Sequence, residues 1–88
     1  MQSYEWDENK RRYNLKKYKI DFIDAIAIFD DPYRIELECY SKGELRFQTI
    51  GIINEVILFL VYTLRGKAKR IISVRRASKN ERKAYHEA

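Results

Sequence analysis

The stretch VILFLVYT, residues 56–63, is the most apolar part of this 88-residue chain. A membrane-spanning helix needs roughly 18 or more apolar residues, so this run is too short to cross a bilayer. A short run of β-branched, aliphatic and aromatic residues is typical of a strand that is covered on both faces. The stretch therefore predicts the central strand of a sheet.

Segments on both sides of this run predict its neighbours in the sheet. Apolar and polar residues alternate over 33–40, and further strands are expected over 45–53 and 69–76. The segments 41–43, 54–55 and 65–67 have the composition of tight turns. Because short turns join antiparallel neighbours, we expect a four-stranded antiparallel meander.

Two helices are predicted before the sheet. Asp7 is placed to begin a helix over 8–18, in which Tyr13, Leu15 and Tyr18 are the expected inward residues. A second helix is expected to begin after Asp21 and to run to about residue 29. The pair Asp31-Pro32 then ends it, because proline disfavours helical geometry in the residue before it.

A third helix is predicted at the end of the chain, over 79–87. Ser78 and Glu81 have the spacing of a capping box, in which each side chain satisfies a free backbone N–H at the helix start. Helices before and after a meander make a single α+β domain over residues 1–88, with helices covering the sheet.

The charge of the chain is concentrated in its last part. Residues 1–64 hold nine Lys/Arg and eleven Asp/Glu, a balance of −2, whereas residues 65–88 hold nine and two, a balance of +7. Such a local excess is the expected footprint of a nucleic-acid-binding surface, because phosphate contacts dominate affinity for a polyanion. A merely solvated basic segment is the alternative.

Cysteine and metal-ligand content restrict the class of protein. Cys39 is the single cysteine, so neither an internal disulfide nor a cysteine-cluster metal site is possible. Residues 1–7 include Glu5 and Asp7, unlike a signal peptide, and a cytoplasmic location is expected. The sequence has no glycine-rich phosphate loop and no histidine pair, so we expect neither a cofactor nor a metal.

The predicted last strand carries the main chemical candidates. With simple alternation, Arg70, Ile72, Val74 and Arg76 point one way, and Ile71, Ser73 and Arg75 point the other. If Ile72 and Val74 join the core, Ser73 and Arg75 project from the opposite face, and Arg65 lies at the preceding turn. Guanidinium groups on rigid strands suit bidentate contacts with phosphate.

A proton acceptor is harder to find. Guanidinium groups stabilise developing negative charge but are poor proton shuttles at neutral pH. The single histidine, His86, is third from the end of the sequence, where a precisely held base is not expected. Tyr62, Tyr85 and Lys17 are alternatives if their pKa values are lowered, and each also has a purely structural interpretation. The acidic pair Asp30-Asp31 is better explained by the helix-ending turn than by a carboxylate site.

Two motifs in a fixed order make the sequence similar to a known family. These are EWDENK at residues 5–10 and RIISVRRA at residues 70–77. With the other matching positions, the resemblance spans residues 4–85. Together they resemble the BrnT toxins of type II toxin–antitoxin systems. The other residues that carry the resemblance are Tyr4, Asn14, Lys17, Phe22, Ala25, Phe29, Asp31, Pro32, Arg46, Ile50, Gly51, Val61, Tyr62, Thr63, Arg65, Glu81, Arg82 and Tyr85.

The resemblance implies a RelE-like toxin fold and an endoribonuclease that arrests translation. It also implies a BrnA-type ribbon–helix–helix antitoxin that neutralises the toxin and binds operator DNA. The toxin itself is expected to contact operator DNA only through this antitoxin. Tyr18 stands where the family usually has histidine after lysine, and Tyr62 where some members have histidine. A histidine base is therefore not carried over: either Tyr18 transfers the proton with a different pH dependence, or the toxin is slow or inactive.

Three groups of site residues are expected on this basis. Arg65, Ser73, Arg75 and Lys17 are the catalytic candidates, and Tyr18, Tyr62 and Tyr85 the candidates for proton transfer. RNA contacts are expected from Arg46, Arg70, Arg76, Arg82 and Lys83. Arg82 and Lys83 could equally meet the antitoxin, and Arg70 and Arg76 could serve structure.

Two other functions also fit a basic surface with no clear acid–base pair. The first is a non-catalytic nucleic-acid-binding or regulatory subunit, which would show salt-sensitive binding without cleavage. The second is a partner-binding protein whose basic surface docks an acidic chain.

Overall fold

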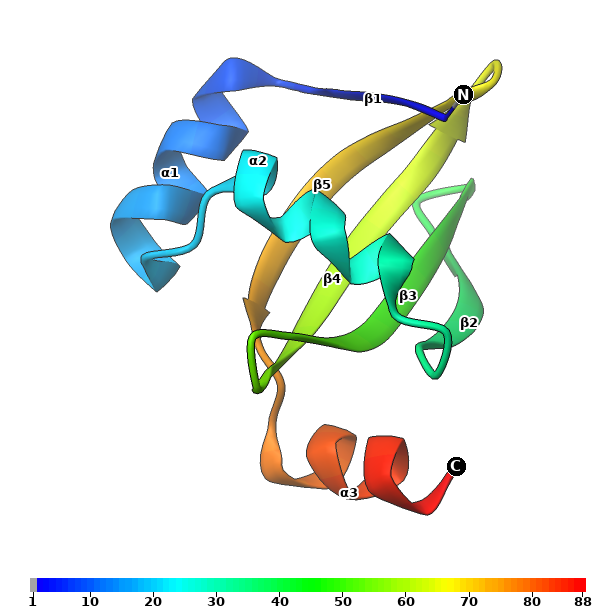
Figure 1. The fold of residues 1–88 in the computed structure, drawn as a ribbon. Coiled ribbons are helices and arrows are strands. Elements are labelled where there is room, and N and C mark those ends of the chain that lie inside the picture. Colours follow the sequence, from blue (N-terminus) through cyan, green and yellow to red (C-terminus); the bar gives the residue numbers. More distant parts are fainter. Residues whose placement is uncertain (1) are drawn as a thin grey trace.

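The computed structural model describes residues 2–88 and consists of one sheet with helices on both faces (Figure 1). Consecutive strands β2 to β5 pair antiparallel, so the predicted meander is confirmed, as is the α+β class. The bounds of these strands are Ile35–Ser41 (β2), Glu44–Ile53 (β3), Val56–Arg65 (β4) and Ala68–Arg76 (β5).

The expectation of only four strands was wrong. Residues Ser3–Trp6 form β1, which pairs in parallel with β5, so the described chain holds a five-stranded mixed sheet in the order β1-β5-β4-β3-β2. The partner of Tyr4 in this pairing is Lys69, far away in the sequence. A four-residue segment is too short for its alternation to predict a strand.

The helices begin where their caps were predicted. Helix α1 (Glu8–Tyr18) is capped by Asp7, α2 (Phe22–Ala25) by Asp21, and α3 (Lys79–Glu87) by the Ser78–Glu81 capping box. The second helix is not one α-helix, because after Ala25 it continues as a 3₁₀ helix, η1 (Ile26–Asp30). Over residues 2–88, no helix has the length and apolar character needed to span a bilayer.

The two faces of the sheet pack against different helices. On one face, α2 and η1 contribute Phe22, Ala25 and Ile28 to a core with Leu60 and Val74 of the sheet. Gly51 lets η1 approach closely, since a Cβ there would lie 2.6 Å from Cγ1 of Ile28. The other face carries a second cluster, around Ile50, Ile57, Ala77, Phe59 and Tyr85 of α3.

Strand β5 contains a β-bulge that changes which side chains share a face. Val61 of β4 is opposite Ser73, but Tyr62 is opposite Ile71, so Ile72 is the extra residue. Ile71 and Val74 are therefore both buried in the first core, although they are three residues apart. The predicted simple alternation of β5 was wrong at this point.

Helix α1 lies beside β5 and buries very little. Tyr13, Leu15 and Tyr18, the residues expected to face inward, are all exposed, and Tyr13 retains 62% of its accessible surface. The buried residue of α1 is Asn14, which is 3% exposed. The predicted amphipathic face of this helix was wrong.

Candidate functional site

Ser73 and Arg75 lie on the face of the sheet opposite α2 and η1. The strand register places Ser73 beside Val61 and Arg75 beside Phe59, whereas Val74 between them is buried in the core. The Arg75 guanidinium lies over the Phe59 ring, 4.2 Å from its centroid. Both side chains are only partly buried, so their polar groups are accessible to a ligand.

Asn14 fixes α1 against β5 at the bulge. The backbone N–H of Val74 donates to Oδ1 of Asn14 at 3.1 Å, and Nδ2 of Asn14 donates to the carbonyl of Ile20 at 3.0 Å. Val74 lies past the end of β1, so its N–H points to an edge of β5 that has no strand partner, and a buried N–H without a partner is costly. The Asn14 amide therefore satisfies this uncovered edge of β5 and joins α1 to β5.

This contact brings the end of α1 to the Ser73 and Arg75 side of β5. Tyr18 lies close enough to Arg75 to interact with its charge, and Tyr18 and Ser73 line the same surface hollow. The ammonium of Lys17 lies 5.2 Å from the Tyr18 ring centroid. Four predicted site residues, Lys17, Tyr18, Ser73 and Arg75, thus gather where α1 meets β5, and we call them the α1–β5 cluster.

The cations of the α1–β5 cluster remain charged at neutral pH. A bidentate hydrogen-bonded pair with Glu81, at 2.8 and 3.0 Å, raises the pKa of Arg75 and lowers that of Glu81. Interaction with the side chains of Tyr18 and Tyr13 raises the pKa of Lys17. A lysine base of lowered pKa, one of the predicted alternatives, is therefore not what the structure shows. As cations, Arg75 and Lys17 can both stabilise negative charge.

Arg65 is not part of this cluster. It pairs with Ala68 at the opposite end of the β4–β5 hairpin and is exposed. Seven residues separate Ala68 from Arg75 along β5, which corresponds to about 20 Å at the usual strand rise. The turn position predicted from the sequence is correct, but it separates Arg65 from Ser73 and Arg75.

Arg46 and Arg70 lie on the same face of the sheet as Ser73 and Arg75, the face opposite α2 and η1. Arg70 was expected on the Val74 face, but the bulge moves it to the opposite one. Its Nη1 donates to Glu5 of β1 at 2.6 Å, and Nε of Arg46 donates to Glu44 at 3.0 Å. Both guanidinium groups therefore have a carboxylate partner.

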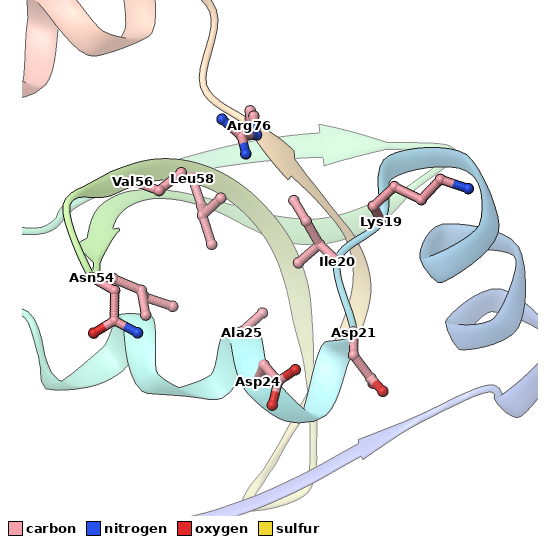
Figure 2. Close-up of a pocket in the computed structure, with 10 residues that line it drawn as sticks. Lys19, Ile20, Asp21, Asp24, Ala25, Asn54, Val56, Leu58 and Arg76 are labelled. Carbon is pink, nitrogen blue, oxygen red and sulfur yellow. The ribbon is translucent and has the colours of Figure 1, made fainter.

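Arg76 lies on the other side of the sheet. It lines a cavity of about 330 Å³ between α2 and the start of β4, shown in Figure 2. The same cavity is also lined by Asp21, Asp24 and Lys19, and Asp21 is already paired with Arg11. Arg76 therefore lies apart from the α1–β5 cluster, and both roles expected for it, RNA contact and structure, stay predictions.

Tyr62 and Tyr85 have structural partners away from the α1–β5 cluster. Tyr62 is buried on the α2 face, where its hydroxyl donates to Glu36 at 2.8 Å. Its pKa is raised mainly by burial and, in second place, by this hydrogen bond. The Tyr85 hydroxyl donates to Asp31 at 2.6 Å, which raises the Tyr85 pKa to about 12. The raised pKa makes each of them a poor proton acceptor at neutral pH, and both lie away from the α1–β5 cluster.

Asp31 itself is a structural residue. Burial would raise its pKa, but hydrogen bonds from Tyr85 and from the backbone N–H groups of Ile52 and Tyr33 outweigh burial and lower it. The turn interpretation of Asp30-Asp31 thus agrees with the structure. Within residues 2–88, no three His, Cys, Asp or Glu side chains form a group suited to a metal ion.

Helix α3 presents the remaining predicted RNA contacts to solvent. Arg82 and Lys83 are exposed, and Nη1 of Arg82 donates to the carbonyl of Ala77 at 2.8 Å. His86 is exposed on the same helix, and its ring lies edge-on to Tyr85. These side chains lie beyond Ala77 and are not brought into the α1–β5 cluster.

Sequence reasoning missed three residues around the α1–β5 cluster. Asn14 and Glu81 were matched to the family but given no site role, with Glu81 assigned only as a cap, and Tyr13 was assigned to the core. The capping box did place Glu81 next to the end of β5, which was the one available signal for its contact with Arg75.

Comparison with known families assigns the chain. The family described as ribonuclease toxin, BrnT, of type II toxin–antitoxin systems matches residues 6–81. The chain belongs to the BrnT family. A search among curated proteins found no match. BrnT membership confirms the resemblance seen in the sequence, and the match extends from the last residue of β1 to the Glu81 partner of Arg75.

Proposed function

We propose that this BrnT protein is a metal-independent endoribonuclease whose active site is the α1–β5 cluster. Cleavage would proceed by attack of a ribose 2′-oxygen on the adjacent phosphorus while its proton passes to an acceptor. The bond from phosphorus to the 5′-oxygen of the next nucleotide breaks, and that oxygen takes up a proton. The products are a 2′,3′-cyclic phosphate and a 5′-hydroxyl. This reaction requires positioning, a proton acceptor and cations for the developing charge.

The α1–β5 cluster supplies groups for each requirement. Arg75 binds the scissile phosphate and stabilises the pentacoordinate transition state, with Lys17 as a second cation. Ser73 donates a hydrogen bond to a phosphate oxygen. Tyr18, next to Arg75, transfers the proton of the 2′-hydroxyl in place of a histidine.

The observation that carries this proposal is the placement of Arg75. It projects from β5 beside Phe59 of β4, near the end of the strand, and its guanidinium fork already binds a planar carboxylate in bidentate geometry. A phosphate presents a similar pair of acceptor oxygens, so the same fork can hold it. Lys17 and Tyr18 reach this site from another element, as expected of an assembled active site.

A BrnA-type ribbon–helix–helix antitoxin is the proposed partner, and operator DNA is reached through that antitoxin. The family is described as part of type II toxin–antitoxin systems, which supports a protein antitoxin. The basic, exposed side chains of α3, Arg82 and Lys83, are suited to an acidic segment of this partner.

Incubation of purified protein with RNA in the presence of EDTA tests the proposed function. We expect cleavage to continue in EDTA and to leave 2′,3′-cyclic phosphate ends. A 2′-deoxyribose at the cleaved nucleotide should abolish the reaction, and Tyr18→Phe should reduce the rate while RNA affinity is retained. Binding without cleavage by the folded protein would instead favour a non-catalytic RNA-binding subunit.

A further inference from the structure

Tyr13 is an exposed aromatic residue that neither the core nor the proposed chemistry uses. Tyr13 lies on α1, as Tyr18 does, and the Lys17 ammonium lies 5.6 Å from the Tyr13 centroid and 5.2 Å from the Tyr18 centroid. Tyr13 and Tyr18 expose 62% and 36% of their surface. Two accessible rings grouped around one cation are therefore presented beside Ser73.

A surface hollow of about 360 Å³ lies between these rings and β5. Tyr13 and Tyr18 line it from α1, and Ile72 and Ser73 line it from the bulge of β5. This volume is within the range of small-ligand sites, which combine apolar walls with a few polar groups. Asn9 and Lys10 supply polar groups, and the buried Asn14 completes the lining.

The charge around this hollow indicates a polyanion. Helix α1 has one acidic residue, Glu8, and five basic ones; of these, Lys10 lines the hollow and Lys17 lies beside both rings, whereas Arg11 is already paired with Glu8 and Asp21. Basic side chains that track a backbone, interleaved with aromatic rings that stack bases, are the usual combination in proteins that bind single-stranded nucleic acid. An apolar protein segment would not require this excess of positive charge.

We propose that Tyr13 and Tyr18, with Lys10 and Lys17, form a stacking platform for one unpaired base of single-stranded RNA. The base enters the hollow beside Ser73, and the neighbouring phosphate reaches Arg75. This inference rests on the proposed function, because Arg75 binds the scissile phosphate there. A base within a duplex is not available for such stacking, so the platform selects single-stranded RNA.

Binding of a non-cleavable RNA tests the platform. The probe is an end-labelled, fully 2′-O-methylated, mixed-sequence single strand, and its Kd is measured by fluorescence anisotropy. We expect Tyr13→Ala to weaken binding about 5- to 100-fold and Tyr13→Phe to stay within about twofold of the wild type, since stacking needs the ring and not the hydroxyl. Tyr40→Ala is the matched control, because Tyr40 is 77% exposed on the distant strand β2 and should leave Kd unchanged.

The salt dependence of Kd separates stacking from charge. Tyr13→Ala should leave the slope of log Kd against log salt unchanged, whereas Lys17→Ala should reduce it. Wild-type affinity in Tyr13→Ala, a loss in Tyr13→Phe as large as in Tyr13→Ala, or a loss of antitoxin affinity without loss of RNA affinity would each overturn the platform.

Cleavage of unmodified RNA keeps the two proposals distinguishable. If the wild type cleaves RNA while Tyr13→Ala binds normally, the platform is wrong and the proposed function stands. If Tyr13→Ala weakens binding as expected but the wild type does not cleave, the proposed activity is wrong and the platform stands. Unchanged circular dichroism and thermal unfolding of the variants exclude misfolding as the cause.

Discussion

The guanidinium of Arg75 is held by both carboxylate oxygens of Glu81, at 2.8 and 3.0 Å, across the junction of β5 and α3. Glu81 is also the acidic member of the capping box that begins α3. The carboxylate therefore occupies the fork that we assign to the scissile phosphate. Phosphate binding must displace Glu81 from Arg75 or share the guanidinium with it.

Glu81→Gln should increase RNA cleavage. A neutral amide competes less well than a carboxylate for the guanidinium, while glutamine still fits the capping box. We expect a lower Kd for RNA and a loss of about 1 kcal/mol or less in the free energy of unfolding, because the pair is partly exposed. Cleavage assays and urea unfolding provide the two values, with Glu87→Gln as the control on the same helix. An unchanged or lower affinity for RNA would show that Glu81 orients Arg75 and does not compete with phosphate.

Asn14→Ala should destabilise the protein and disturb the α1–β5 cluster. The substitution leaves the buried Val74 N–H and the Ile20 carbonyl without their side-chain partner, which costs about 2–4 kcal/mol for two hydrogen bonds. Urea unfolding measures this cost, and Arg12→Ala on the exposed side of α1 is the control.

The effect of Asn14 on activity should differ from its effect on stability. Asn14→Asp keeps the acceptor for Val74 and loses the donor to Ile20, so we expect it to fold at low temperature. Its kcat should fall more than its affinity for RNA, because Lys17 and Tyr18 shift relative to Ser73. Equal stability of Asn14→Ala and the wild type would show that the hydrogen bonds of Asn14 with Val74 and Ile20 do not hold α1 in place.

Tyr85→Phe should loosen α3 and change the acid sensitivity of the fold. The lowered pKa of Asp31 means that the unfolded chain binds the proton more readily than the folded protein does. Its contribution to stability is therefore complete above the unfolded pKa of about 4 and is lost as pH falls below that value. Removing the Tyr85 hydroxyl weakens this contribution of Asp31 to stability. We expect the free energy of unfolding to fall by about 1–3 kcal/mol at pH 7.

Urea unfolding at pH 7 and at pH 3 checks this expectation. The difference between the wild type and Tyr85→Phe should be smaller at pH 3 than at pH 7, because the contribution of Asp31 to stability begins to be lost below the unfolded pKa of about 4. His86→Ala is the control, since this neighbour on α3 is exposed. A difference that stays constant with pH would show that the hydroxyl does not act through the Asp31 carboxylate.

The parts of the fold that were predicted correctly are those with local signals. The apolar run of β4, the turns around it and the caps Asp7, Asp21 and Ser78 each depend on residues close in sequence. Strand β1 escaped prediction because its pairing joins Tyr4 to Lys69, and no local pattern records such a contact.

In the candidate site, too, features with a local sequence signal were predicted and features that depend on distant contacts were not. Ser73 and Arg75 could be placed together because they share one strand, but the bulge at Ile72 reversed the expected facing of Arg70. The approach of Lys17 and Tyr18 depends on a buried asparagine in a helix with almost no apolar face. Because Asn14 acts through backbone groups of Val74 and Ile20, its role could be found only in three dimensions.

The rate of RNA cleavage by Arg75→Ala tests the central claim most directly. The wild type, Arg75→Ala, Arg75→Lys and the control Arg82→Ala are compared on one RNA, with folding checked by thermal unfolding. We expect Arg75→Ala to lose at least 100-fold in rate, as is usual when a transition-state donor is removed, and Arg75→Lys to recover part of it. Arg82→Ala should cleave at close to the wild-type rate. Full activity in a folded Arg75→Ala protein would contradict the assignment of the α1–β5 cluster as the active site.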